Sequence, residues 1–242
     1  MKSKQVTFRE LLLSFAPKYR LQNVFQDFLG MCLCAFCINP RTGKSYYEDE
    51  YIACIQKYDA PHQKLFPELL AKLVLEMEKS AQNGICIDVL GNLYQELFYQ
   101  ARSGQFFTPE PITGFMAEIS GQATEERLSI IDPCCGSGRM LLSSAKVMGK
   151  HHQFFGIDID LPCVQMTAIN LFLNGIFHAE VMCANALKFD DFHISYRTSF
   201  LPFGIFRIDD KEQSLLYQIR QSQIEKYAPN AQQQTGTQLS IF

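Results

Sequence analysis

The first hundred residues carry apolar side chains at the spacing of amphipathic helices. In one stretch, five of them recur every three or four residues, at Leu21, Val24, Phe25, Phe28 and Leu29. That spacing places them on one face of a helix. Further helices are expected over 50–55 and 65–77, and Thr7 followed by Glu10 is a capping-box pattern before the first apolar run. The sequence therefore predicts an N-terminal helical region.

After residue 100 the pattern changes to short apolar runs that alternate with helical segments. The β-branched pair at 130–131 is typical of a buried strand, and a glycine turn and an apolar helix start follow over 136–142. A second strand is expected over 154–158, a helix over 163–173, and a third strand with its exit loop over 179–187. Such alternation predicts an α/β fold with a parallel sheet, whose ligand lies at the carboxyl ends of the strands.

Composition and charge change this picture little. The chain has 242 residues, 47% of them hydrophobic, with a formal net charge of −3 and a pI of about 6.0. That size supports one good core or two small ones. Nucleic-acid binders usually show a basic stripe, and the overall charge gives none. The cations among the first thirty residues are interpreted as a solvated helix face.

The nine cysteines are scattered and odd in number, which favours reduced thiols over a disulfide framework. Cys32, Cys34 and Cys37 lie close together, but no second pair or nearby histidines stand at zinc-site spacing. We interpret them as core residues and expect no bound metal. The N-terminus is polar and no apolar run approaches membrane-spanning length, so a soluble cytoplasmic protein is expected.

Two carboxylates follow the first two predicted strands. Asp132 stands before the glycine turn, where its charge would repel a phosphate and attract an amino group, and no Gly-Lys-Ser/Thr sequence supports a phosphate loop. Asp158 ends the second strand about twenty residues after the turn, the spacing of a ribose-binding carboxylate in α/β units. A helix N-cap is the alternative role, and Asp160 suits that role better.

Three motifs in one order give the chain a family resemblance. They are Gly104-Gln105-Phe106-Phe107-Thr108-Pro109, the stretch Ile130 to Leu142, and Gly156-Ile157-Asp158-Ile159-Asp160. Together they resemble the cofactor motifs of the N6-adenine DNA methyltransferases, most closely the methylation subunit of type I restriction–modification systems. The resemblance begins near Asp88. It implies a Rossmann-like S-adenosylmethionine-dependent methyltransferase sheet, here truncated in strand number, behind an N-terminal helical region.

The resemblance also implies a cofactor, S-adenosyl-L-methionine, and partners, namely DNA and restriction–modification subunits. Asp132 would hold the methionine amino group, Gly136 and Gly138 would let the backbone approach the cofactor, and Asp158 would bind ribose. Asn185 would face the adenine edge, with a turn-forming role as the alternative. The complete expected cofactor set is Gln105, Phe106, Phe107, Thr108, Pro109, Asp132, Pro133, Cys134, Gly136, Ser137, Gly138, Asp158 and Asn185.

Two parts of this resemblance leave alternatives open. Phe106 and Phe107 are core anchors, or one of them lies against the methionine or adenine of the cofactor. The N-terminal helical region contacts DNA and partner subunits, as in the family, or is a helical cap that covers the sheet.

The family's fourth motif, Asp/Asn-Pro-Pro-Phe/Tyr, is missing, and the chain contains no Pro-Pro. That motif accepts the hydrogens of the adenine amino group and stacks on the flipped base. By its position along the chain, the stretch that corresponds to this motif is Phe200-Leu201-Pro202-Phe203. Pro202 and Phe203 match the second half of the motif, and Phe200 stands in place of its polar residue. A phenyl ring cannot accept an amino hydrogen in plane, so this alignment predicts severely impaired chemistry on adenine.

The missing motif has three possible explanations. The chain is a degenerate relative of the family, a piece that a partner completes, or an enzyme with another substrate. A competing hypothesis is a non-catalytic DNA-associated adaptor. Its support is the uncharged tail that ends in Gln238-Leu239-Ser240-Ile241-Phe242, which resembles the bacterial sliding-clamp-binding pentapeptide through Gln238, Leu239, Ile241 and Phe242. The alternative is a tail that folds back onto its own core.

The expected domain organisation has four parts. Residues 1–100 form the helical region, and residues 101–210 form the S-adenosylmethionine-binding methyltransferase-like domain. Residues 211–226 form a C-terminal helix, and residues 227–242 a flexible tail.

Overall fold

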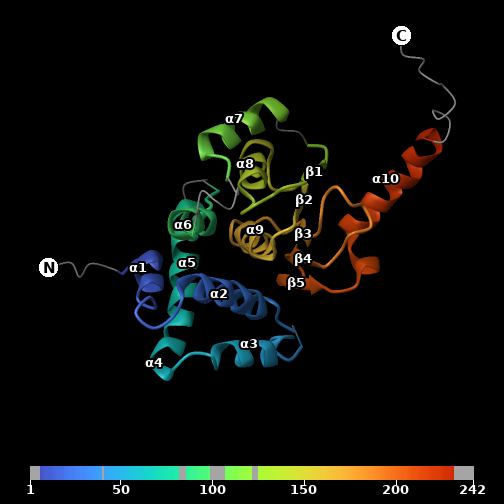
Figure 1. Ribbon diagram of the computed structural model, residues 1–242. Coiled ribbons are helices and arrows are strands. Elements are labelled where there is room, and N and C mark those ends of the chain that lie inside the picture. Colours follow the sequence, from blue (N-terminus) through green and yellow to red (C-terminus); the bar gives the residue numbers. More distant parts are fainter. Residues whose placement is uncertain (1–5, 40, 82–85, 99–106, 122–124, 232–242) are drawn as a thin grey trace, which may run out of the picture.

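A five-stranded sheet with helices on both faces forms the centre of the molecule (Figure 1). The computed structural model describes residues 6–39, 41–81, 86–98, 107–121 and 125–231. The helices before the sheet are α1 (Phe8–Leu13), α2 (Leu21–Phe36), α3 (Glu48–Ile55), α4 (Ala60–Gln63), α5 (Leu65–Ala81), α6 (Val89–Phe98) and α7 (Glu110–Ser120). The remaining elements are β1 (Ser129–Asp132), α8 (Arg139–Met148), β2 (Gln153–Asp158), α9 (Leu161–Leu173), β3 (Ala179–Cys183), β4 (Ile194–Ser199), β5 (Gly204–Ile208), the 3₁₀ turn η1 (Lys211–Gln213) and α10 (Leu215–Ala231).

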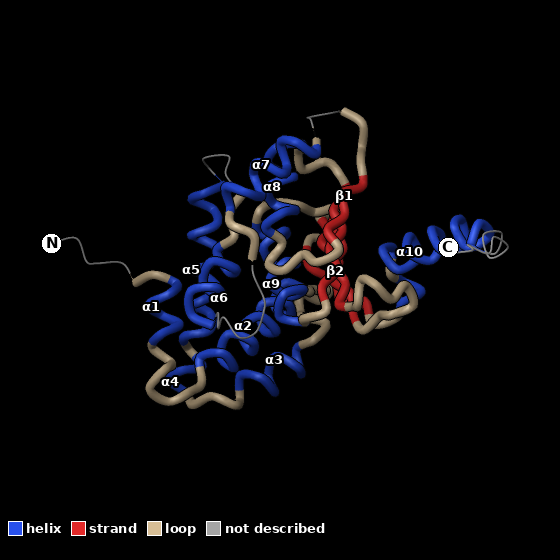
Figure 2. The backbone as a smooth tube through the Cα atoms, turned by 45° about the horizontal axis from the view of Figure 1, so that its top comes forward, coloured by secondary structure: helices blue, strands red, loops and turns tan. Residues whose placement is uncertain are grey.

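The strands lie in chain order, β1-β2-β3-β4-β5. The first three are parallel, with Ile131 opposite Phe155 and Gly156 opposite Val181. Their crossover helices α8 and α9 lie on one face of the sheet, and α10 lies on the other (Figures 1 and 2). Successive right-handed crossovers in one direction place their helices on the same face. The predicted α/β class and the parallel arrangement of the three expected strands are therefore confirmed, but the five-stranded sheet as a whole is mixed.

The direction of the sheet reverses at β4, which runs antiparallel to β3. The link between these strands, residues 184–193, contains no helix, and a parallel return normally needs a crossover of a dozen or more residues. The turn over 200–203 then joins β4 to β5, with Ser199 opposite Gly204. Because Thr198 lies opposite Ala179, this turn stands at the amino ends of the parallel strands.

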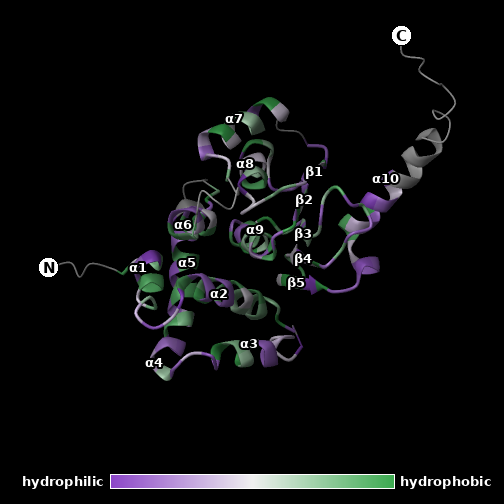
Figure 3. Ribbon diagram, viewed as in Figure 1, coloured by the Kyte–Doolittle hydropathy of each residue, from purple (hydrophilic) through white to green (hydrophobic). Residues whose placement is uncertain are grey.

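One continuous core joins the helical region to the sheet. Phe36 of α2 meets Phe172 of α9 with ring centroids 5.1 Å apart, and Figure 3 shows hydrophobic residues along both helices. The helical region therefore packs on the α9 face of the α/β unit. The division into domains at residue 100 stays a prediction, because the two parts share these contacts.

The predicted capping box and the predicted burial of the clustered cysteines are confirmed. Thr7 and Glu10 form the capping box of α1. Cys32, Cys34 and Cys37 are buried, and all nine cysteines are free thiols. Among the described residues, no helix combines the length and the apolar character needed to cross a membrane.

The C-terminal helix differs from the prediction. Helix α10 continues to Ala231, so residues 227–231, which were placed in a flexible tail, are helical. Once a helix is nucleated, each added residue gains a backbone hydrogen bond, and a polar composition alone does not end it.

A buried carboxylate on β3 fixes the start of α10. Glu180 is 1% exposed and accepts hydrogen bonds from the Ser214 hydroxyl at 2.5 Å and from the backbone N–H groups of Leu215 and Leu216 at 3.2 and 3.3 Å. Arg197 on β4 donates to the same carboxylate at 2.7 Å. Negative charge at a helix N-terminus is favourable, so one side chain ties two strands to the helix.

We expect Glu180→Gln to destabilise the fold by about 2 kcal/mol, because it removes the charge of a buried carboxylate that pairs with the half-exposed Arg197 and replaces an acceptor by a donor. Urea unfolding followed by circular dichroism measures this change. The exposed Glu212 provides the control as Glu212→Gln, which should leave the free energy of unfolding within about 0.5 kcal/mol. Equal stability of the two variants would contradict the role given to Glu180.

Candidate functional site

A cavity of about 560 Å³ opens at the carboxyl ends of the parallel strands. Ligand pockets for small molecules are commonly about 300–1,000 Å³, so its size suits one cofactor. Nine of the expected cofactor residues line it: Phe107, Thr108, Asp132, Pro133, Cys134, Gly136, Ser137, Asp158 and Asn185. The structure therefore brings together motifs that lie far apart in the sequence.

The glycine turn has no room for side chains. Gly136 has φ +56°, and a Cβ there would lie 2.9 Å from ring carbons of Phe107. Gly138 has φ +85° and is the N-cap of α8; a Cβ there would lie 2.8 Å from Thr167. Both positions combine a left-handed backbone with close contacts. Phe107 thus packs under the turn and also lines the cavity, so both of its proposed roles remain open.

Asp158 connects the end of β2 to the glycine turn. Its two oxygens accept the backbone N–H groups of Gly136 at 2.8 Å and of Asp160 at 2.9 Å. Asp160 occupies the N-cap position of α9, as expected, but its side chain makes no capping hydrogen bond. Each carboxylate oxygen has a second lone pair, so Asp158 keeps acceptor capacity toward the cavity.

Asp132 lies on the other side of the turn, at the end of β1. One of its oxygens accepts the backbone N–H of Cys134 at 3.0 Å. Burial raises the pKa of Asp132, and the nearby Asp158 adds to that increase. Burial likewise raises the pKa of Asp158. Two partly buried carboxylates at one cavity therefore favour a ligand that brings a positive charge and hydroxyl groups.

Asn185 lies in the loop that follows β3, where it forms a local turn. Its side-chain oxygen accepts the backbone N–H of Leu187 at 3.0 Å, so the turn-forming role is present. The residue also lines the cavity, and its amide can still donate. Leu187 and Ile159 also line the cavity, and they are 90% and 69% exposed. These apolar side chains could cover a flat ring, and the sequence analysis missed them.

Arg220 of α10 holds this exit loop in place. Its guanidinium donates to the carbonyl oxygens of Lys188 at 2.6 Å, Asn185 at 3.1 Å and Asp191 at 3.3 Å. The residue is only 5% exposed. Arginine suits this task because its planar donors reach several acceptors at once. Sequence reasoning missed Arg220 because nothing around it forms a motif.

A second missed group is the buried carboxylate of Asp88, just before α6. It accepts hydrogen bonds from the Ser137 hydroxyl at 2.5 Å, from Arg139 Nε at 3.0 Å, and from Asn170 Nδ2 at 2.7 Å. Burial raises the pKa of Asp88, and these donors favour its charged form. We call the four residues Asp88, Ser137, Arg139 and Asn170 the Asp88 network. It clamps the glycine turn between α6 and α9.

Arg139 extends the Asp88 network to the cavity wall. It donates to the backbone oxygen of Thr108 at 3.0 Å and to the side-chain oxygen of Asn92 at 2.8 Å. It also lies over the Phe107 ring, 6.0 Å from the centroid. The segment before α7 is therefore held by the same arginine that holds the glycine turn.

The remaining expected residues lie elsewhere. Pro109 is the N-cap of α7, while Gln105 and Phe106 lie outside the described residues. Pro202 and Phe203 lie in the turn between β4 and β5, at the amino ends of the parallel strands and away from the cavity. There Phe203 packs against Phe172 with ring centroids 4.8 Å apart. The structure thus separates both catalytic candidates from the cavity, because β4 is antiparallel.

The clamp-binding candidates Gln238, Leu239, Ile241 and Phe242 lie outside the described residues. That partner stays a prediction. Across the described part of the chain, no three His, Cys, Asp or Glu side chains gather closely enough to hold a metal ion.

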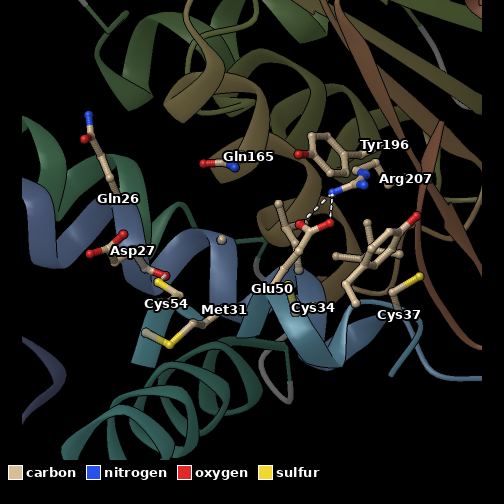
Figure 4. Close-up of a pocket in the computed structure, with 14 residues that line it drawn as sticks. Gln26, Asp27, Met31, Cys34, Cys37, Glu50, Cys54, Gln165, Tyr196 and Arg207 are labelled. Atoms are coloured by element: carbon tan, nitrogen blue, oxygen red, sulfur yellow. Dashed lines mark hydrogen bonds and ion pairs between the residues drawn. The ribbon is translucent and has the colours of Figure 1, made fainter. Parts of the chain in front are cut away.

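A smaller cavity of about 180 Å³ lies between α2, α3 and the β4–β5 hairpin (Figure 4). Its charged groups are already paired. Arg207 donates to Glu50 at 2.8 Å and lies over the Tyr47 ring, 4.1 Å from the centroid. Asp27 accepts from Lys57 at 2.8 Å. It contains none of the three sequence motifs, so the larger cavity is the candidate site.

Replacing Asp88 by Asn should destabilise the fold by about 3 kcal/mol, because it leaves the buried Arg139 without its counter-charge. Thermal and urea unfolding measure the loss. Asp49→Asn, at an exposed position of α3, is the matched control and should change stability by less than about 0.5 kcal/mol. A stable Asp88→Asn variant would show that the network does not depend on the charge.

The residues that line the cavity lie within a stretch of the chain that matches a known family. The family described as N-6 DNA Methylase matches residues 86–233. The chain is 26% identical over 188 residues to the type I restriction enzyme MpnII methylase subunit of Mycoplasma pneumoniae, covering 68% of this chain and 34% of that protein. It is 28% identical over 145 residues to the type II restriction enzyme and methyltransferase RM.BcgI of Heyndrickxia coagulans, covering 53% and 22%.

Among solved structures, the type I restriction-modification system methyltransferase subunit from Streptococcus thermophilus has a TM-score of 0.35 at 18% identity, covering 72% of this chain and 56% of that one. The chain spans about a third or less of the length of the two relatives named above. The family match runs from the Asp88 network through α10 and covers more than half of the sequence, so this chain belongs to the N-6 DNA methylase family.

Proposed function

We propose that the chain binds S-adenosyl-L-methionine in the cavity at the strand ends, as the cofactor-binding part of an N6-adenine DNA methyltransferase. The observation that carries this proposal is the placement of two partly buried carboxylates, Asp132 and Asp158, on either side of the tight turn at Gly136. When bound, this cofactor supplies a methyl group that its sulfonium centre makes electrophilic.

The charges of the cavity suit this ligand. Asp132 is assigned to the methionine ammonium group, for which a carboxylate in a partly buried site is a strong partner. Asp158 is assigned to the ribose hydroxyls, because its oxygens keep free lone pairs. Ile159 and Leu187, exposed at the mouth, are assigned to the faces of the adenine ring. Thr108 and Phe107, held by Arg139, close the side toward α7.

The substrate is inferred from the relatives. Their names describe a methylase subunit and a restriction enzyme with methyltransferase, which supports DNA as the substrate and other restriction–modification chains as partners. The candidate turn over residues 200–203 lies at the amino ends of the parallel strands, whereas the cavity lies at their carboxyl ends. The turn therefore supplies no acceptor for an amino hydrogen at this cavity. We therefore propose that the chain binds the cofactor but transfers little methyl by itself.

Calorimetry with S-adenosylmethionine tests the cofactor site. We expect micromolar binding to the intact chain and at least about tenfold weaker binding to Asp158→Ala, because charge-assisted hydrogen bonds contribute about 1.5–3 kcal/mol each. Asp190→Ala, an exposed carboxylate outside the cavity lining, is the matched control and should bind normally. Absence of binding to the intact chain would refute the proposal.

Binding should also weaken as the pH falls. Burial raises the pKa values of Asp132 and Asp158, so both lose their charge at a higher pH than ordinary carboxylates, and the ammonium group then loses its partner. Calorimetry between pH 8 and pH 5 should show this loss of affinity. Asp132→Asn should bind weakly with a flatter pH profile, and an unchanged affinity of the intact chain down to pH 5 would contradict the role of Asp132.

A further inference from the structure

A second large cavity lies at the amino ends of the parallel strands, opposite the candidate cofactor site. Its volume is about 500 Å³. Its lining comes from the link after α8 (Lys150 and His151), the link after α9 (Phe177 and His178), and the end of β4 with its turn (Ser199 and Phe200). We call it the amino-end cavity. It shares no lining residue with the cavity at the carboxyl ends, so the two can hold different ligands.

The charges of the amino-end cavity are opposite to those of the candidate cofactor site. Its ionisable lining residues are Lys150, His151 and His178, and no carboxylate of the described chain lines it. The other cavity is lined by Asp132 and Asp158. A cavity lined by one sign of charge concentrates ions of the opposite sign, so the amino-end cavity favours an anion.

Two of these side chains keep donors for a ligand. Lys150 Nζ donates to the backbone oxygen of Asn174 at 2.7 Å, at the carboxyl end of α9, which leaves two of its three N–H groups. Among the described residues, the side chain of His178 has no hydrogen-bond or ion-pair partner. Capping of α9 therefore accounts for one donor of Lys150 and leaves the others available.

A further cation lies close to His178. Burial lowers the pKa of His178, and the nearby Arg127 lowers it further. Arg127 lines a smaller cavity of about 180 Å³ that shares Phe177, His178 and Ser199 with the first. Its buried Glu180 is paired with Arg197 at 2.7 Å. An anion beside His178 would relieve the repulsion from Arg127.

An aromatic ring is exposed at the same cavity. Phe200 is 56% exposed, and its ring centroid lies 5.4 Å from that of Phe177. Phe177 in turn packs on Phe172 of α9 with centroids 5.7 Å apart. The Phe200 ring is therefore backed by the core and open to a ligand. Nucleobases stack on such rings whatever their identity, because every base has a π-face.

The volume separates an organic ligand from a simple ion. A cavity of about 500 Å³ falls in the usual range of small-molecule pockets, about 300–1,000 Å³, and is far larger than one phosphate group. The ligand therefore combines an anionic group with a body that fills the space beside Phe200.

We propose that the amino-end cavity binds a nucleoside phosphate, with its phosphate group between Lys150, His151 and His178. The base then stacks on Phe200, and the Ser199 hydroxyl offers a further hydrogen bond. A phosphate monoester carries a charge of about −1.5 to −2 at pH 7 and three strong acceptor oxygens, which suits the donors of this cavity. The site is independent of the proposed cofactor, because it shares no residue with the other cavity.

Calorimetry with thymidine 5′-monophosphate tests this site. The probe lacks the adenine ring assigned to the cofactor cavity, and saturating S-adenosylmethionine should leave its affinity unchanged. We expect it to bind at least about tenfold more tightly than thymidine, ribose 5-phosphate or inorganic phosphate, because the base and the phosphate group both contribute. The ionic strength is kept low and constant, since salt screens exposed charges.

Substitutions then test the two parts of the site separately. Lys150→Gln and Phe200→Ala should each lower the affinity for thymidine 5′-monophosphate about tenfold. The matched controls are Lys64→Gln and Phe115→Ala, which are exposed and line neither cavity, and both should bind normally. His178→Gln should also weaken binding, and it keeps the Tm of the parent because its side chain has no partner to lose.

Proton NMR of the histidine rings locates the ligand. Thymidine 5′-monophosphate should shift the ring signals of His178 and raise its pKa, because a neighbouring anion favours the charged imidazole. His62, which is paired with Asp59 in the helical region, is the control and should not respond.

The inference is overturned if the probe binds no more tightly than inorganic phosphate, if Lys150→Gln and Phe200→Ala bind it normally, or if S-adenosylmethionine displaces it. An oligothymidylate that binds more than about 100-fold more tightly, with the same losses, would identify a polynucleotide site and also overturn it. Asp158→Ala should bind the probe normally. The failure of this site and the failure of the proposed function are therefore distinguishable.

Discussion

The buried carboxylate of Asp88 is the interaction on which the site depends. It lies 49 residues before Ser137 and 82 before Asn170 in the chain, yet it accepts hydrogen bonds from both and from Arg139. A buried charge is tolerated only when it is paired and fully hydrogen-bonded. The carboxylate therefore holds α6, the glycine turn and α9 in one relative position, and through Arg139 it also holds the segment at Thr108.

The Asp88 network explains how the tight glycine turn can form one wall of the cavity. Gly136 and Gly138 adopt left-handed backbone angles and touch Phe107 and Thr167, which gives the turn little freedom once its neighbours are fixed. On the other side, Arg220 fixes the carbonyl groups of the β3 exit loop from α10. Both walls are therefore positioned by buried arginines, Arg139 inside the second cofactor motif and Arg220 outside all three motifs. The carboxylates between the walls stay available to a ligand.

The sequence predicted those parts of the fold whose signals are local. The apolar strand at β1, the glycine turn and the α9 helix follow from residue type and spacing, and so does the convergence of Asp132, Asp158 and Asn185 at one edge. The direction of β4 was not predictable in this way, because Ile194–Ser199 carries no mark of its pairing partner. Pro202 and Phe203 match the missing catalytic motif only by their position along the chain. Because β4 is antiparallel, they lie at the amino ends of the parallel strands, and the cavity lies at the carboxyl ends. Asp88 and Arg220 escaped because their partners are distant in sequence.

The same topology underlies the proposed separation of cofactor binding from methyl transfer. Binding needs the carboxyl ends of β1, β2 and β3, and these are all present with their helices on one face. In the proposed function, methyl transfer to an amino group also needs hydrogen-bond acceptors at the cavity, and the candidate turn over 200–203 lies at the opposite ends of the strands. The short link after β3 reverses the direction of the chain, so β4 runs antiparallel beside β3. Strands β4 and β5 therefore extend the sheet on the side away from β1. Among the described residues, no strand therefore lies on the other side of β1, so the sheet borders the cavity on one side of that strand only.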